Sequence, residues 1–233
     1  MKINKRIRCE FLLVSLTVAL FFQTTSARAV TTWYVSKSGD DLANAGNESS
    51  APFASITNAL AKASINDEIK VSAGVYTQSV SFATGKAGIT ICGGYNPSTW
   101  SWIPSNNTTT IRGDGGAAVT LNAGAYSNTL TCLTLTTASS SYDGINAAGG
   151  ATNLIVDSCT IISNRYGVNG GDRNLWNAIF KNSIIAKNKN EGLYFNHGSN
   201  FSGANCFLYN CIVAGNGGDG FYTRTPGGWG VIS

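Results

Sequence analysis

The feature that most constrains this chain is a segment of similar sequence that occurs three times between residues 152 and 223. Each copy is followed by a glycine and an apolar residue. A period in the twenties, built from short β-type segments and Asn/Gly turns, is typical of a solenoid of stacked coils. The sequence therefore predicts an all-β solenoid. The three copies are Leu154–Asn164, Ala178–Asn188 and Cys206–Asn216.

Alternation within each copy predicts which side chains face the interior, because neighbouring residues of a strand point to opposite sides. Ser158, Asn182 and Asn210 fall at a turn, where we expect their side chains to hydrogen-bond from coil to coil. The predicted inward columns are Leu154/Ala178/Cys206, Val156/Phe180/Leu208 and Ile161/Ile185/Val213.

The N-terminal residues are typical of a secretory signal peptide. Four basic residues precede an apolar run from Phe11 to Phe22, which is short for a membrane span, and Ala27-Arg28-Ala29 offers a cleavage site. We predict a signal peptide over 1–29 and one β-helix domain over 30–233. No later apolar run has transmembrane length, so the mature chain is expected to be secreted, periplasmic or on the cell surface.

The charge of the mature chain argues against nucleic acid as a partner. The formal net charge is +4, but five of the 16 basic residues and one of the 12 acidic residues lie in 1–29. The remainder carries eleven of each, without the basic surface that phosphate binding requires. A monomer is expected.

Five cysteines follow the signal peptide: Cys92, Cys132, Cys159, Cys206 and Cys211. An odd number leaves at least one free thiol in an unpaired chain. Cys159 and Cys211 share a column but lie two coils apart, which is too far for a disulfide. We expect the cysteines to serve as small buried apolar residues.

Residues 52–64 predict a short helix, with Pro52 in its first turn and apolar residues at helical spacing. Such a helix would cover the first coil. Its preceding loop, Gly39–Ser50, carries acidic and amide side chains that could bind calcium, although no specific calcium motif is present. At the other end the chain stops at Ser233 with no predicted closing helix, which leaves either a folded tail or a truncated chain.

Several segments resemble secreted right-handed parallel β-helix proteins of the pectate-lyase-like superfamily. The resemblance covers most of residues 33–223 and implies that fold. It does not define the activity, because the superfamily holds lyases, glycosidases, adhesins and proteins of unknown role. The segments are Trp33–Ser36, the Gly39-Asp40 loop, Ala51–Ile56, Val71–Thr77 and the stretch from Gly93 to Trp100.

The strand after the glycine of each repeat predicts an outer face that suits a glycan. Aromatic rings pack on apolar sugar faces, while amides and carboxylates bind hydroxyls. The resemblance implies a substrate cleft along a comparable strand face. The predicted ligand-binding residues are Asp143, Asn169, Tyr194, Asn196, Tyr222 and Arg224.

Glu191 and Asp219 are the candidate catalytic pair. They fall one coil apart, about 5 Å, which matches the carboxylate spacing of retaining glycosidases. Acidic residues before glycine are also ordinary turn residues. Asp157 and Lys181 allow a similar choice between a lyase acid–base pair and a surface ion pair. The catalytic motifs of polygalacturonases are absent, and no metal ligands are predicted.

Three hypotheses about function remain open. The chain binds polysaccharide along the strand face and cleaves it, as a lyase or glycoside hydrolase. Alternatively, it is a non-catalytic surface or adhesin-type module that binds glycan without turnover. In the third, it is a truncated fragment without activity.

Overall fold

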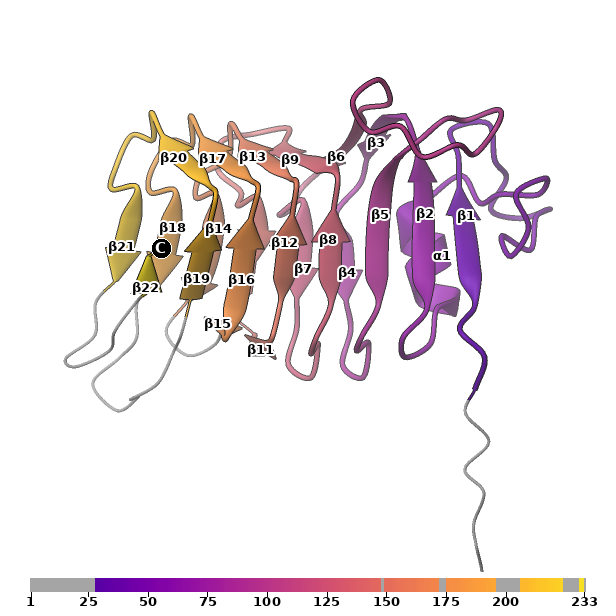
Figure 1. Ribbon diagram of the computed structural model, residues 1–233, viewed down its shortest axis with the longest axis horizontal. Helices are drawn as coiled ribbons and strands as arrows, with labels where there is room; N and C mark the ends of the chain where they lie inside the picture. The colour runs from indigo at the N-terminus through magenta and orange to yellow at the C-terminus, as the bar shows by residue number, and fades with distance from the viewer. Residues whose placement is uncertain (1–27, 148, 172–174, 196–205, 224–230, 233) are drawn as a thin grey trace, which may run out of the picture.

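The computed structural model describes residues 28–147, 149–171, 175–195, 206–223 and 231–232, and shows a parallel β-helix (Figure 1). Every strand pairing between named strands is parallel, and successive coils pair with each other. The first sheet faces the viewer in Figure 1. Its strands, in spatial order, are β1 (Thr32–Val35), β2 (Glu68–Ser72), β5 (Thr90–Tyr95), β8 (Thr129–Thr131), β12 (Ile155–Asp157), β16 (Ala178–Lys181), β19 (Cys206–Tyr209) and β22 (Val231–Ile232).

Two further sheets close each coil. The second sheet runs along the top of Figure 1 and contains β3 (Gly74–Thr77), β6 (Thr109–Gly113), β9 (Leu133–Thr137), β13 (Thr160–Ile162), β17 (Ile184–Ala186) and β20 (Ile212–Ala214). The third sheet lies behind and contains β4 (Val80–Phe82), β7 (Val119–Leu121), β10 (Ile145–Asn146), β14 (Val168–Gly171), β18 (Leu193–Phe195) and β21 (Phe221–Thr223). A short pair, β11 (Ala151–Thr152) and β15 (Leu175–Trp176), adds one more parallel contact.

The predicted inward columns are confirmed. Val156 pairs in register with Phe180, and Phe180 pairs with Leu208. Ile161, Ile185 and Val213 pair in the same way on the second sheet. Val156 and Phe180 are fully buried. Burial of such columns along the whole axis is what stabilises a solenoid, because each coil covers the apolar face of the next.

In the four coils that begin with β8, β12, β16 and β19, the corner between the first and second sheets uses one left-handed residue. Cys132, Ser158, Asn182 and Asn210 have φ between 50° and 54°. Asparagine tolerates this conformation better than other non-glycine residues, so its recurrence here has a backbone cause. The predicted ladder is confirmed for Asn182 and Asn210, whose side chains hydrogen-bond at 2.9 Å. Ser158 instead donates to Asp157 at 3.0 Å.

A helix packs against the N-terminal coil, as expected, but it is shorter than predicted. The helix α1 (Ile56–Lys62) contacts β1, β2 and β4, and buries Ile56, Ala59 and Leu60. Residues 52–55 are not helical, because Asp41 Oδ1 accepts hydrogen bonds from the amides of residues 54 and 55. Ser55 then caps the helix by accepting from the Asn58 amide at 3.1 Å.

The buried carboxylate of Asp67 ties the N-terminal strand to this end of the solenoid. It accepts from the amides of Thr31 and Ser64, from the indole of Trp33 and from Arg28. Burial alone would raise its pKa, but these donors hold the pKa of Asp67 far below its ordinary value. Cleavage after Ala29, as the sequence predicts, would remove Arg28 and leave the other three donors in place.

All five cysteines that follow the predicted signal peptide are free thiols. Cys92, Cys159 and Cys206 are buried, as the sequence analysis expects, whereas Cys132 and Cys211 are half-buried. Burial raises the pKa of the Cys159 thiol to about 12. A buried thiol of this kind behaves as a small apolar side chain.

Candidate functional site

A ladder of tyrosines runs along the outer side of the third sheet. The register pairs Asn146 with Asn169, Asn169 with Tyr194, and Tyr194 with Tyr222. The Tyr194 and Tyr222 rings stack at 5.2 Å between centroids and 9° between planes. Tyr166, from the turn before β14, stacks on Tyr194 at 4.7 Å and 22°. Three successive coils therefore contribute one continuous row, which we call the tyrosine ladder (Tyr166, Tyr194 and Tyr222).

An ion pair supports the start of the ladder. Arg165 donates from Nε and Nη2 to the two carboxylate oxygens of Asp143, both at 2.8 Å. Its guanidinium lies 5.0 Å from the Tyr166 ring centroid, within cation–π range. The Asp143 side chain is 1% exposed, whereas that of Arg165 is 40% exposed. The carboxylate thus orients an arginine at the surface, and the arginine covers the first ring.

Two of the predicted ligand-binding residues lie beneath the face rather than on it. Asp143 is buried, and its carboxylate accepts hydrogen bonds from Arg165 and from Asn169, the latter at 2.9 Å. Asn169 is 9% exposed, and its Oδ1 accepts from the Gly171 amide at 3.0 Å. The expected outward placement of Asp143 is wrong, because its carboxylate is held against the sheet by hydrogen bonds from Arg165 and Asn169. Its partner Arg165 was not identified from the sequence.

Tyr194 and Tyr222 are partly exposed on the outer face, as the alternation predicts. Asn196 and Arg224 lie outside the described residues. Their predicted binding roles stay predictions.

Glu191 and Asp219 lie in adjacent coils. The Gly192 amide donates to the Asp219 carbonyl at 2.9 Å, which aligns the two turns. Asp219 is exposed, while Glu191 is half-buried and its carboxylate lies against Gly218. Glu191 Oε2 is buried with no hydrogen-bond partner among the described residues. Within the described part of the chain, the Glu191 carboxylate forms no ion pair, in contrast to that of Asp143. The catalytic roles of Glu191 and Asp219 stay predictions.

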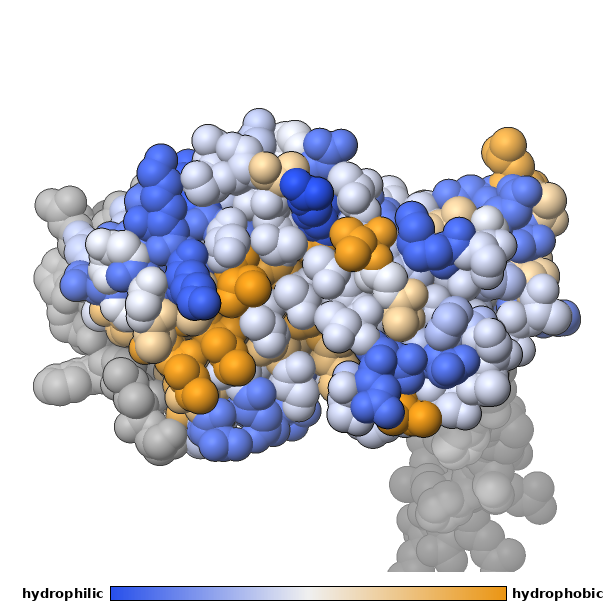
Figure 2. All heavy atoms as spheres, turned by 90° about the horizontal axis from the view of Figure 1, so that it is seen from above, coloured by the Kyte–Doolittle hydropathy of each residue, from blue (hydrophilic) through white to orange (hydrophobic). Residues whose placement is uncertain are grey.

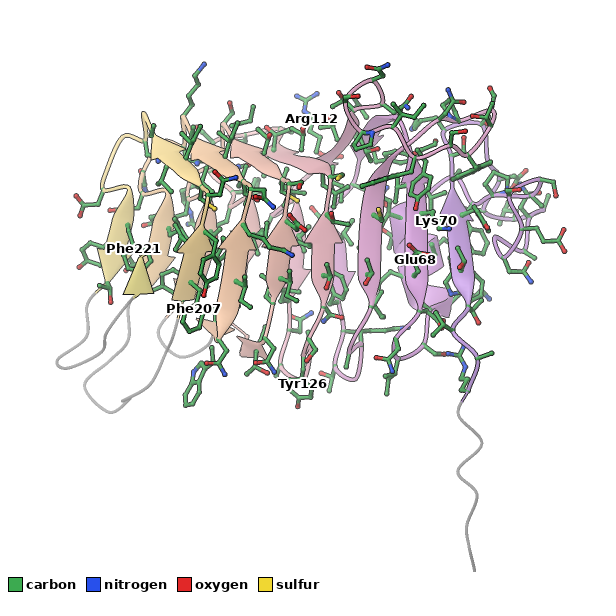
Figure 3. The ribbon with its side chains drawn as sticks, viewed as in Figure 1. Glu68, Lys70, Arg112, Tyr126, Phe207 and Phe221 are labelled. Carbon is green, nitrogen blue, oxygen red and sulfur yellow. The ribbon has the colours of Figure 1, made fainter. Side chains whose placement is uncertain are left out.

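Charged groups on the outer side of the first sheet form ion pairs. Lys181 Nζ lies 3.2 Å from Asp157 Oδ2, and Lys70 Nζ lies 3.5 Å from Glu68 Oε2; the latter two residues are labelled in Figure 3. Partial burial would raise the pKa of Asp157. Hydrogen bonds from Asn182, Lys181 and Ser158 outweigh this effect and lower the pKa. Of the two alternatives for Asp157 and Lys181, the structure shows the surface ion pair.

Among the residues that the structure describes, no three His, Cys, Asp or Glu side chains gather as they would around a metal ion. In the polar loop before α1, Asp40 and Asp41 accept hydrogen bonds from backbone amides. These oxygens act as turn caps. Calcium binding in the Gly39–Ser50 loop stays an untested prediction.

The outer side of the second sheet changes character along the axis, which the sequence analysis missed. One row runs through Thr110, Thr134 and Thr160 and continues through Ile184 and Ile212. The last two side chains are 40% and 59% exposed. Figure 2, seen from above, shows hydrophobic side chains gathered over the C-terminal coils. The alternation that predicts the inward column Ile161/Ile185/Val213 also makes Ile184 and Ile212 outward residues, so this row could have been predicted.

Part of the chain matches one family model. Residues 37–82, from the loop after β1 to β4, match the family described as "Protein of unknown function (DUF1565)". A comparison with curated protein sequences gives no match. Within the described residues, no helix is both long enough and apolar enough to cross a bilayer.

The fold resembles that of a solved pectate lyase. Pectate lyase Pel9A superposes with a TM-score of 0.54 at 14% sequence identity, covering 82% of this chain and 55% of that chain. A rhamnogalacturonan lyase gives a TM-score of 0.48 at 17% identity, with 87% and 65% covered. The chain thus spans little more than half the length of the pectate lyase. At this identity the likeness to Pel9A concerns the fold alone. By its fold, this chain is a right-handed parallel β-helix, similar to that of pectate lyase Pel9A.

Proposed function

We propose that this chain binds polysaccharide along the outer side of the third sheet, with the tyrosine ladder at its centre. The observation that carries the proposal is the stacking of Tyr166, Tyr194 and Tyr222 from three successive coils. Successive strands of a sheet lie about 4.8 Å apart, so the row repeats at short, regular intervals along the solenoid axis. A periodic, straight row suits an extended polymer better than a compact ligand.

The chemistry of the row also suits a glycan. The rings cover each other's faces, so a sugar would meet ring edges and phenol groups rather than the open ring faces that the sequence analysis expects. Carboxylates of Glu191 and Asp219 and the guanidinium of Arg165 lie in the turns that lead into the same strands. Such groups donate to and accept from sugar hydroxyls, and ring edges contribute apolar contact. The predicted export of the chain would place it where polysaccharides are found.

Affinity electrophoresis tests the proposal with gels that contain polygalacturonate, galactan or no polysaccharide. The wild-type chain should be retarded in at least one polysaccharide gel. Tyr222→Ala should weaken that affinity about tenfold, because one aromatic contact is worth about 1.5 kcal/mol. Tyr194→Phe keeps the stack and removes one hydroxyl, so it separates ring contact from hydrogen bonding.

Tyr126→Ala is the matched control. Tyr126 is 49% exposed, lies in the loop before β8 and points away from the body of the solenoid (Figure 3). It should bind as the wild type does. Equal retardation of Tyr222→Ala and wild type, or no retardation of the folded wild type in any gel, would remove the proposal.

A narrower proposal is that Glu191 and Asp219 cleave the bound polymer. It is supported by their position in adjacent turns and by the Glu191 oxygen that has no hydrogen-bond partner within the described segments. The same gels, followed by assays for unsaturated and reducing ends, distinguish a lyase or hydrolase from a binding module. If the wild type releases ends, Glu191→Gln should stop release and keep retardation. Unchanged release would exclude Glu191, and retardation without release would favour the adhesin-type alternative.

A further inference from the structure

A pocket of about 310 Å³ opens at the corner between the first and second sheets, away from the tyrosine ladder. Its floor is formed by β9 and β13 and the turns that precede them. The loop between β5 and β6 forms one wall. Its lining includes Trp102, Pro104, Thr108, Thr134, Ser158 and Thr160.

Two glycines of β5 hold the wall in place. The Trp102 indole donates to the Gly93 carbonyl at 3.1 Å, and the Ile103 amide donates to the Gly94 carbonyl at 3.0 Å. Gly94 has φ +88°, and a Cβ there would lie 2.7 Å from Pro104 Cβ. Glycine is therefore required for the loop to lie against the strand. The wall of the pocket therefore depends on Gly93 and Gly94, which explains why the sequence has two glycines here.

The pocket offers hydroxyl groups that the fold does not use. The side-chain hydroxyls of Thr108, Thr134 and Thr160 have no hydrogen-bond partner among the described residues. Thr134 and Thr160 lie side by side on adjacent strands and point outward. Ser158 Oγ donates to Asp157 at 3.0 Å, so its oxygen can still accept. These groups can bind the hydroxyls of a ligand, because a hydroxyl both donates and accepts.

The pocket also offers one large aromatic surface and no charge. Trp102 is 54% exposed although its indole N–H is already bonded. Sugars bind where an aromatic ring meets a few convergent polar groups. No lining residue is charged, and placing a carboxylate beside uncharged walls is costly. Pockets for small ligands begin at about 300 Å³, so the volume suits one sugar unit rather than a chain.

We propose that this pocket is a binding site for a single neutral sugar unit, with Trp102 as the aromatic contact and Thr134 and Thr160 as hydrogen-bonding groups. The site is independent of the tyrosine ladder, because it lies on different sheets. It is also independent of whether the ladder binds polysaccharide. The two sites predict opposite responses to the variants Thr134→Val and Tyr222→Ala.

Fluorine NMR of the full chain labelled with 5-fluorotryptophan tests the site. The chain has five tryptophans, and Trp102→Phe identifies the Trp102 resonance. The probes are methyl β-galactoside, methyl β-glucoside, methyl α-mannoside and, as the charged comparison, galacturonate. At least one neutral glycoside should shift the Trp102 resonance saturably, and galacturonate should bind about tenfold more weakly or not at all.

Variants locate the binding. Thr134→Val keeps the shape of an outward strand residue and removes its hydroxyl, so affinity should fall several-fold with an unchanged melting temperature. Tyr222→Ala should leave the Trp102 shift unchanged. The proposal is overturned if no neutral glycoside shifts Trp102, if Thr134→Val binds as the wild type does, or if galacturonate binds equally well. Loss of the shift in Tyr222→Ala would assign the binding to the ladder instead.

Discussion

The repeats place asparagines at two corners of each C-terminal coil, and the two corners use the same amide for different purposes. At the outer corner, between the first and second sheets, Asn182 and Asn210 are exposed and left-handed. At the inner corner, between the second and third sheets, Asn164 and Asn188 are 0% and 2% exposed. Asparagine at the outer corner adopts the left-handed backbone conformation that the turn requires. Asparagine at the inner corner supplies hydrogen bonds where the sheet ladder is interrupted.

Asn188 shows what the inner ladder does. Its Oδ1 accepts from both the amide and the side chain of Asn164, each at 3.1 Å. Its Nδ2 donates to Asn216 at 2.9 Å and to the Ile161 carbonyl at 3.3 Å. Each inner asparagine is followed within three residues by a residue of the proposed binding face. These residues are Tyr166, Glu191 and Asp219. The buried corner therefore also positions the proposed binding face.

Replacement of Asn188 tests the inner corner and has the largest expected effect. Asn188→Ala should lower the free energy of unfolding by about 3 kcal/mol, because it leaves buried donors and acceptors of two neighbouring coils unpaired. Urea denaturation followed by circular dichroism measures the change. A loss below about 1 kcal/mol, as expected of exposed polar residues, would erase the distinction between the corners.

Replacement of Asn182 tests the outer corner and should cost less. Its φ is 52°, and the hydrogen bonds of its side chain with Asp157 and Asn210 are exposed. Asn182→Ala should cost about 1 kcal/mol, mainly from the left-handed backbone. Asn182→Gly should be within about 0.5 kcal/mol of the wild type, since glycine adopts this conformation freely. If Gly costs as much as Ala, the side-chain bonds rather than the backbone determine the choice of asparagine.

Acid should change the effect of Asn182→Ala but not that of Asn188→Ala, and this is the smallest expected difference. The folded state lowers the pKa of Asp157, so its contribution is present above the unfolded pKa of about 3.9 and is lost as pH falls through the folded value. The destabilisation caused by Asn182→Ala should therefore shrink below about pH 4. That caused by Asn188→Ala should not change, because its partners do not titrate. The acid sensitivity that Asp67 confers is the same in the wild type and in both variants, so it cancels from the differences in unfolding free energy. Parallel changes in both variants would contradict this account.

Much of the fold could be predicted from the sequence, because burial and strand alternation leave a periodic record. The columns through Val156 and Ile161 are examples. The two roles of asparagine could not be separated in this way, since Asn182 and Asn188 recur with the same period. Which corner is buried depends on how the three sheets close, and that is a property of the whole coil.

The binding face was predictable only in part. Tyr194 and Tyr222 follow the alternation and lie where it predicts. Asp143 and Arg165 lie in turns, where side-chain direction has no simple period, so the ion pair beneath the ladder could not be predicted. The pocket beside Trp102 depends on a loop that returns to its own strand, which a coil-by-coil interpretation does not include.

Hydroxyl-radical footprinting of the full chain with and without a polysaccharide that retards it tests the central claim most directly. Radicals modify exposed tyrosines, and the chain carries its own controls: Tyr126 and Tyr209 are 49% and 43% exposed and lie outside the ladder. The account predicts that polysaccharide protects Tyr166, Tyr194 and Tyr222 and leaves these two unchanged. Protection of Tyr126 or Tyr209 with no change in the ladder would contradict it.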